Sequence, residues 1–296
     1  MEFRLRNKKD KIFRKIFKTT GMLVICILTG IFLMLIYNSI AFFLHFKPVD
    51  FLTGTQWNPD NDNNADYGIL PLLASTFLVT AGAMIIAVPL GICTAAFLSE
   101  FAGKRLQNFL KPAIEMLAAI PSVAIGFLGI IIVGPGIAKL FGIQSGLNAL
   151  NGSVLLAVMS LPTIITIAED AIHAVPLSYR EGSYALGADK WATLFKITLP
   201  AAKPGLIAAI MLGMGRAMGE TMTVLMATGN AAAFPKGFLT SVKTITATIA
   251  IEMGEVPYQT THYFALFAIA AVLFIITLAI NLIGESVINR VRKFHL

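Results

Sequence analysis

Six long apolar stretches are the feature of this sequence that most restricts its fold. A helix needs about 20 mostly apolar residues to cross the hydrocarbon core of a bilayer, and each stretch reaches that length. The stretches are Gly21–Phe46, Ile69–Leu98, Pro112–Phe141, Ser153–Ile172, Pro204–Asn230 and Tyr263–Ile288. The sequence therefore predicts an all-α, polytopic membrane protein with six transmembrane helices.

The low charge content supports this prediction. Charged residues make up 13% of the chain and hydrophobic residues 56%, with a mean hydropathy of +0.77. A soluble domain carries about 25% charged residues, so a soluble enzyme, a disordered tail and a coiled coil are excluded. Cys26 and Cys93 both lie in apolar stretches, and we interpret them as small apolar side chains rather than a disulfide or metal site.

The basic residues fall mostly on one side of the predicted membrane. Alternate connections share a side, and segments 1–20, 99–111 and 173–203 with the C-terminal end hold 18 of the 23 lysines and arginines. The remaining connections hold four, and Arg216 lies inside the fifth apolar stretch. Because lysine and arginine are enriched in cytoplasmic loops, we expect both termini in the cytoplasm.

The chain divides into four expected parts. Residues 1–20 form a basic cytoplasmic segment, which sets the topology or lies as an amphipathic helix on anionic lipid. Residues 21–68 hold the first transmembrane helix and an external loop. That apolar stretch is about twice as long as the core of a signal peptide, so we interpret it as a retained helix. The core follows at 69–288 and a cytoplasmic tail at 289–296.

Prolines inside the second and third stretches predict irregular helices. Pro89 lies in the second stretch, and Pro121 and Pro135 lie in the third. Proline removes a backbone donor and clashes with the preceding turn. We therefore expect bends or short re-entrant pieces at these positions.

Residues 173–203 form a cytoplasmic loop that does not resemble a linker. Its apolar and aromatic residues recur at roughly helical spacing. They are Leu177, Tyr184, Leu186, Trp191, Leu194 and Phe195. We expect short helices, broken at Gly187, that pack on the helix ends of this chain or on a partner.

The same loop resembles the EAA signature of ABC importer permeases. The matching residues are Glu181, Gly187, Ile197, Leu199 and Pro200. The two positions after the glutamate hold glycine and serine, where the family often has alanines. The resemblance implies a coupling helix that docks into a groove on a separate ATPase subunit. This chain has no Gly-x-x-x-x-Gly-Lys-Ser/Thr phosphate-binding loop of its own.

Arg216 and Glu220 are charged residues inside the fifth stretch. Arg216 lies about 18 Å along a helix that starts at Pro204, at 1.5 Å per residue, and Glu220 follows one turn later on the same face. A charge near mid-bilayer costs about 2.5–3.5 kcal/mol. Two interpretations stay open: a structural Arg–Glu pair, and an anion site in a translocation path that includes Thr221 and Thr223.

A carboxylate beside the arginine suggests a substrate preference. The planar guanidinium suits an oxyanion, whereas Glu220 would repel a bare dianion. Glu220 can accept a hydrogen bond from a protonated oxyanion, and phosphate near neutral pH carries such a proton while sulfate does not. We hypothesise that Glu220 favours phosphate for this reason.

Further motifs resemble the phosphate-specific subgroup of ABC permeases. They are Arg216-Ala-Met-Gly-Glu-Thr221, Trp57-Asn-Pro59 with Tyr67-Gly-Ile-Leu-Pro71, and Ile251-Glu-Met-Gly-Glu255 before His262-Tyr-Phe-Ala-Leu266. The last two groups resemble the PstC-type subunit more than its PstA-type sister. The resemblance covers nearly the whole chain. It implies the type I ABC importer permease fold and a pore-forming, non-enzymatic subunit without cofactor or metal, in the inner membrane of a prokaryotic cell.

The resemblance also implies partners. They are a homologous PstA-type permease in a heterodimer, a dimer of ATP-binding subunits and an extracytoplasmic phosphate-binding protein, with membrane lipid around them and no nucleic acid.

The external segment 231–262 is open to two interpretations. It holds Lys236, Lys243 and Glu252 and a hydroxyl-rich run at 240–248. It either folds partly back into the membrane near an outer gate or forms a plain solvated loop.

The remaining titratable groups near span ends are interpreted as structural. His173 and His262 have no second ligand at metal spacing. We interpret Glu169 and Asp170 as solvated or helix-end charges. We interpret Lys111 and Glu115 as an i,i+4 pair at a helix end.

Three other functions compete with that of a phosphate importer permease. One is a permease for another oxyanion, such as molybdate or sulfate. Only the family resemblance favours phosphate over these anions. A proton-coupled secondary transporter with Glu220 as the carrier is disfavoured because six spans without a visible repeat do not fit that class. An intramembrane enzyme is disfavoured because no catalytic pair lies at a usable depth.

Overall fold

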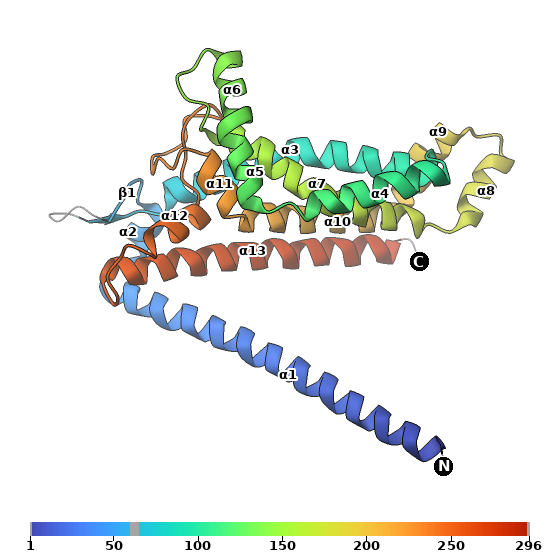
Figure 1. The fold of residues 1–296 in the computed structure, drawn as a ribbon, viewed down its shortest axis with the longest axis horizontal. Coiled ribbons are helices and arrows are strands. Elements are labelled where there is room, and N and C mark those ends of the chain that lie inside the picture. The colour runs from blue at the N-terminus through green and yellow to red at the C-terminus, as the bar shows by residue number, and fades with distance from the viewer. Residues whose placement is uncertain (1, 60–64, 295–296) are drawn as a thin grey trace.

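The computed structural model describes residues 2–59 and 65–294, and helices dominate it (Figure 1). The elements in these ranges are α1 (Glu2–Phe43), α2 (Pro48–Thr53), β1 (Trp57–Asn58), β2 (Asp66–Tyr67), α3 (Leu70–Glu100), α4 (Lys104–Ala118), α5 (Ser122–Leu128), the π-helical turn η1 (Gly129–Val133), α6 (Gly134–Phe141), α7 (Ala149–His173), α8 (Leu177–Ala185), α9 (Lys190–Thr193), the π-helical turn η2 (Leu194–Thr198), α10 (Leu199–Gly219), α11 (Met222–Ala227), α12 (Ile245–Glu252) and α13 (Thr261–Phe294).

Six helical segments of the described chain are long and apolar enough to cross a membrane, which confirms the predicted number. They are Phe13–Phe43, Leu70–Glu100, Ser122–Phe141, Ala149–His173, Lys190–Gly219 and Thr261–Ile288. The fifth segment differs from the expectation, because it ends at Gly219 rather than at Asn230. Hydropathy does not detect this end, since only Glu220 and Thr221 interrupt the apolar residues before they resume at Met222.

The first helix packs on the last one. α1 continues through residue 20 without a break, so the basic N-terminal residues and the first apolar stretch belong to one helix. Its Ser39 hydroxyl donates to the Phe267 carbonyl on α13 at 3.1 Å. Figure 1 shows α1 and α13 side by side at one end and diverging toward the other.

α3, α7 and α10 form the centre of the bundle, and glycines let them approach closely. A Cβ added to Gly91 on α3 would lie 2.6 Å from Ile164 Cγ2, and one added to Gly213 on α10 would lie 2.5 Å from Ile164 Cγ1. Both distances are shorter than real carbon contacts. Ile164 on α7 is fully buried. It packs between α3 and α10, against the backbone at Gly91 and Gly213.

The three prolines have different consequences. α3 runs past Pro89 without interruption. The helix is therefore not broken at this proline. Pro121 separates α4 from α5, and Pro135 lies in the first turn of α6, directly after η1. The third apolar stretch is therefore divided into pieces, and Figure 1 shows α6 directed across the bundle axis while α4 runs along it.

Aromatic packing closes one end of the bundle. β1 and β2 form an antiparallel hairpin in which Trp57 pairs with Tyr67. The Tyr67 ring lies 5.5 Å from Phe42 at the end of α1, centroid to centroid, and Phe42 lies 5.2 Å from Phe51 on α2. Phe42 and Phe51 are fully buried. This cluster fixes the hairpin over α1 and α13.

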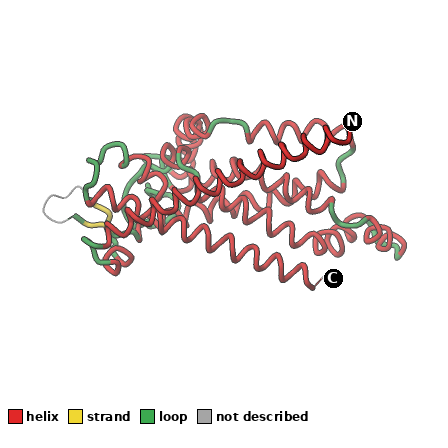
Figure 2. Tube along the Cα trace, turned by 90° about the horizontal axis from the view of Figure 1, so that it is seen from below, coloured by secondary structure: helices red, strands yellow, loops and turns green. Residues whose placement is uncertain are grey.

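The two ends of the bundle carry different structures. α8 and α9 lie at the same end as both chain termini (Figure 1), and the strands lie at the opposite end (Figure 2). The loop 173–203 and the outer ends of α1 and α13 thus lie at the same end of the bundle.

Candidate functional site

The helix that carries Arg216 breaks within the next turn. α10 ends at Gly219, Glu220 has an extended backbone (φ −69°, ψ 134°), and α11 begins at Met222. The Oε1 atom of Glu220 accepts hydrogen bonds from the backbone N and the hydroxyl of Thr223, both at 3.4 Å. The expectation that Glu220 continues the helix of Arg216 is wrong, and its carboxylate contacts the start of α11.

Arg216 is exposed on α10. In the part of the chain that the structure describes, it has no hydrogen bond and no ion pair, so the structural Arg–Glu pair is not formed. It lies about one turn beyond Gly213, which meets Ile164 near the middle of α7. An unpaired guanidinium therefore lies level with the middle of a membrane-spanning helix.

Thr223 connects two helix breaks. Its hydroxyl donates to the backbone carbonyl of Ser122 at 3.2 Å and contacts the Met159 sulfur at 3.0 Å. Ser122 begins α5, directly after the break at Pro121. Thr223 is fully buried, whereas Thr221 is half-buried and lies in the break itself. The expected site residues thus divide into Arg216, Glu220 and Thr221 at an accessible break and Thr223 in the packing behind it.

A threonine that sequence reasoning did not single out also contacts this break. The Thr246 hydroxyl on α12 donates to the Glu220 carbonyl at 2.8 Å. The only sequence signal for it was the hydroxyl-rich run at 240–248, which gave no indication of the contact with Glu220.

α12 also shows that the external segment is not a plain solvated loop. Ile245, Ala247 and Thr248 are fully buried, and Glu252 is 9% exposed. The short helix returns into the bundle and contacts α3, α11 and α13.

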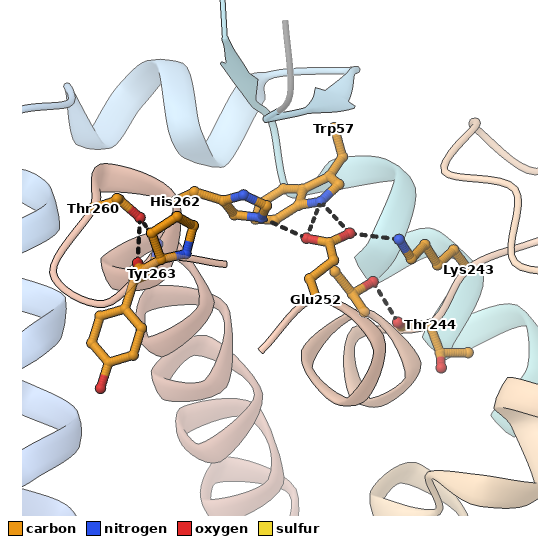
Figure 3. A network of polar contacts seen from close by, with 9 residues as sticks. Trp57, Lys243, Thr244, Glu252, Thr260, His262 and Tyr263 are labelled. Atoms are coloured by element: carbon orange, nitrogen blue, oxygen red, sulfur yellow. Dashed lines mark hydrogen bonds and ion pairs between the residues drawn. The ribbon is translucent and has the colours of Figure 1, made fainter. Parts of the chain in front are cut away.

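Glu252 is the centre of a polar cluster at the hairpin end (Figure 3). Its carboxylate accepts hydrogen bonds from Trp57 Nε1 at 3.1 and 3.2 Å, and it pairs with Lys243 Nζ at 2.5 Å and with His262 Nε2 at 2.8 Å. Burial alone would raise the pKa of Glu252. The hydrogen bonds from His262 and Lys243, the charge of Lys243 and the hydrogen bond from Trp57 outweigh burial and hold the pKa below its ordinary value.

The opposite end presents the EAA-like residues. Glu181 on α8 is exposed, and Gly187 adopts a left-handed backbone (φ +80°) between α8 and α9, where glycine is favoured. Ile197 and Leu199 are half-buried at the junction of η2 and α10, and Pro200 lies in the first turn of α10.

Two polar contacts hold α8 in place. Arg180 Nη2 pairs with Glu100 Oε1 at the end of α3 at 2.8 Å and donates to the Ile172 carbonyl on α7 at 2.9 Å. The buried hydroxyls of Ser183 and Thr193 lie 2.9 Å apart and connect α8 to α9. α8 is therefore fixed to two bundle helices and to its neighbour.

The apolar residues of this loop are only partly covered. Leu194 is buried, and the Trp191 ring packs 4.5 Å from Phe101, centroid to centroid. Leu186 is 90% exposed, and Leu177 and Phe195 are 67% and 60% exposed. Some of the apolar residues of the loop therefore pack on the chain's own helix ends, as predicted. The others form an exposed apolar surface.

Two expectations about charges at this end are wrong. Glu169 is buried rather than solvated, and its Oε1 pairs with Lys111 Nζ at 2.7 Å. Lys111 therefore reaches from α4 to α7 instead of pairing with Glu115 along its own helix. Asp170 and His173 are exposed, as expected for groups at a helix end.

Comparisons with known proteins show the family of this chain. The family model described as "Binding-protein-dependent transport system inner membrane component" matches residues 87–293. The chain is 41% identical over 231 residues to the "Probable ABC transporter permease protein YqgH" of Bacillus subtilis, covering 78% of this chain and 74% of that protein. It is 32% identical over 301 residues to the "Phosphate transport system permease protein PstC" of Mesorhizobium japonicum, covering 95% and 90%.

Solved structures share the fold. A chain of the inward-facing MetNI methionine ABC transporter superimposes with a TM-score of 0.56 at 21% identity, covering 76% of this chain and 94% of that one. A chain of a bacterial alginate ABC transporter gives a TM-score of 0.62 at 14% identity, covering 95% and 97%. At these identities the likeness concerns the fold alone.

Proposed function

Because the chain belongs to the family of binding-protein-dependent transport system inner membrane components, we propose that it is the membrane-spanning subunit through which an ATP-driven importer moves inorganic phosphate. It is a multi-pass ABC transporter permease and not an enzyme, since ATP hydrolysis belongs to a separate subunit in this family. The phosphate assignment is supported by relatives named as phosphate transport permeases that align with nearly the whole chain.

The observation that carries the proposal is the unpaired Arg216. A guanidinium facing lipid at mid-span costs about 2.5–3.5 kcal/mol on insertion scales, so this face of α10 is covered by protein or lines an aqueous path. Leu212, Arg216 and Gly219 are exposed and Ala208 is half-buried. They lie at steps of three or four residues and so form one stripe along the helix. This stripe is the path that a translocated anion follows.

The site binds phosphate through two kinds of contact. Arg216 donates hydrogen bonds from its guanidinium to the oxyanion and balances its charge. Glu220, at the break after α10, accepts a hydrogen bond from the proton that phosphate retains near neutral pH. Its contacts with Thr223 hold the carboxylate in place.

The partners complete the pore and supply the energy. The exposed stripe of α10 faces a homologous PstA-type permease, so that the path lies between two subunits. The exposed Leu186, Leu177 and Phe195 surface docks on the ATP-binding subunits, with Glu181 and Gly187 in the docking segment. An extracytoplasmic phosphate-binding protein delivers the substrate to the hairpin end. In this arrangement both termini lie in the cytoplasm of a prokaryotic cell.

The proposal is tested by purification and uptake together. Membrane extraction of the tagged chain is expected to recover a second permease and an ATPase, and recovery of this chain alone would overturn the proposal. In proteoliposomes holding the whole complex, Arg216→Ala is expected to lower phosphate uptake at least 100-fold while the subunit ratio stays unchanged. Uptake of molybdate or sulfate in preference to phosphate would assign the transporter to another oxyanion.

A further inference from the structure

α12 is held at its N-terminal end by α3. The Ile245 backbone N–H donates to the Thr76 hydroxyl at 3.1 Å, and Thr244 caps the helix by accepting from Ala247 N at 3.3 Å. Ile245 and Ala247 are fully buried. The first turn of α12 therefore has a fixed position beside the bundle.

From this turn, Thr246 extends to the break in the α10–α11 helix. Its hydroxyl donates to the Glu220 carbonyl at 2.8 Å and lies 3.2 Å from the Thr244 hydroxyl. The last carbonyls of a helix lack partners within the helix and must find them elsewhere. Here the partner comes from a different element and fixes the peptide group that carries the Glu220 side chain.

The C-terminal end of α12 is held by the Glu252 cluster (Figure 3). Trp57 comes from the hairpin, His262 from the start of α13 and Lys243 from the segment before α12. A buried carboxylate that loses such partners is strongly destabilised. The cluster therefore ties α12 to elements that lie outside the bundle centre.

We propose that α12 acts as a strut and that Thr246 and Glu252 are positioning residues for transport. Glu252 holds the outer end of α12, and Thr246 transmits that position to the Glu220 peptide group, so that the Glu220 carboxylate faces the translocated oxyanion. The inference rests on the proposed function, because it assigns these residues a role at the proposed phosphate site.

The first test compares two threonines of the same helix. Thr246→Val removes the hydroxyl that reaches Glu220 and keeps the side-chain shape. Thr248→Val is the matched control, since the buried Thr248 hydroxyl donates only to the carbonyl of Thr244, the N-cap residue of α12, at 2.8 Å. Both variants are assembled into the whole complex and assayed for phosphate uptake in proteoliposomes.

Thr246→Val is expected to raise the KM for phosphate about tenfold and to lower the preference for phosphate over sulfate, with an unchanged thermal midpoint. Thr246→Ser retains the hydroxyl and restores both values. A Thr246→Val variant that behaves like Thr248→Val would overturn the inference. If the unmodified complex takes up no phosphate, the proposed function itself is wrong. This outcome differs from one in which the unmodified complex transports phosphate and only the role of Thr246 is refuted.

The second test asks whether the two ends of α12 act together. Glu252→Gln is expected to raise the KM for phosphate in the same direction. Because both residues act through one element, the double variant Thr246→Val/Glu252→Gln is expected to be no worse than the more affected single variant. Multiplied effects in the double variant would show that the ends act separately and would refute the strut.

Discussion

The hydroxyl of Thr223 donates to the backbone carbonyl of Ser122 at 3.2 Å and so joins two interrupted helices at one point. α4 ends before Pro121 and α10 ends at Gly219, and the short helices that follow, α5 and α11, pack against each other. Breaks within a membrane are tolerated where protein satisfies the freed backbone groups. This contact therefore stabilises both irregular segments next to the proposed path.

Replacing Thr223 by valine removes this bond, and the contact of the same hydroxyl with Glu220 Oε1, without changing the side-chain shape. The part-buried Ser122 carbonyl loses its Thr223 donor, and the complex is expected to lose about 0.5–1.5 kcal/mol of stability. Thermal unfolding of the purified complex measures the loss. Thr94→Val is the control, because that hydroxyl bonds only within α3, and an equal loss in both variants would contradict the interpretation.

Glu220→Gln tests the role of the carboxylate in choosing the anion. The amide keeps the shape but provides a weaker acceptor for the proton of phosphate, so phosphate uptake is expected to fall at least tenfold and the preference over sulfate to narrow. Competition between the two anions in proteoliposomes measures both effects. Unchanged flux and unchanged preference would remove Glu220 from the recognition of phosphate.

The Glu252 cluster predicts a pH dependence of stability. The pKa of Glu252 in the folded protein lies below its ordinary value of 4.5, so its stabilising contribution is complete above about pH 4.5 and is lost as the pH falls through the lowered pKa. Glu252→Gln lacks this contribution and is expected to lower the thermal midpoint at neutral pH. The difference in thermal midpoint between the two proteins should shrink below pH 4.5; a constant difference would contradict the prediction.

Leu186→Glu tests the exposed apolar surface beside Gly187. The side chain is 90% exposed, so the stability of the permease is expected to change by no more than about 0.5 kcal/mol. A charge at a docking anchor costs at least about 2 kcal/mol of association, so co-purification of the ATPase is expected to fall about 30-fold. Val49→Glu on α2, exposed at the opposite end, serves as the control and should leave the ATPase bound.

Local sequence signals predicted the helices better than the contacts between them. An apolar stretch of about 20 residues is a strong signal, and the number of spans follows from it. The end of α10 at Gly219 was missed because the two polar residues after it, Glu220 and Thr221, are too few to interrupt the apolar stretch. The burial of Glu169 was missed because its partner, Lys111, is distant in the chain and is brought close only by the packing of α4 on α7.

The candidate site shows the same division. Arg216 stands out as the only basic residue deep in an apolar stretch, and sequence alone identified it. The contact of Thr246 with the Glu220 carbonyl has no local signal, since it depends on where α12 returns to the bundle. Residue type indicates which side chains are costly in a membrane, whereas the three-dimensional fold decides which of them acquire partners.

The acceptor in the contact between Thr223 and Ser122 is a main-chain atom, and this has a consequence for natural variation. Every amino acid at position 122 supplies the same backbone carbonyl, so a substitution there does not remove the hydrogen bond from Thr223. Only the donor can be lost by mutation, and selection on the contact acts on Thr223 alone. A mutational scan should therefore find tolerance at position 122 and intolerance at position 223, although the two residues share one bond.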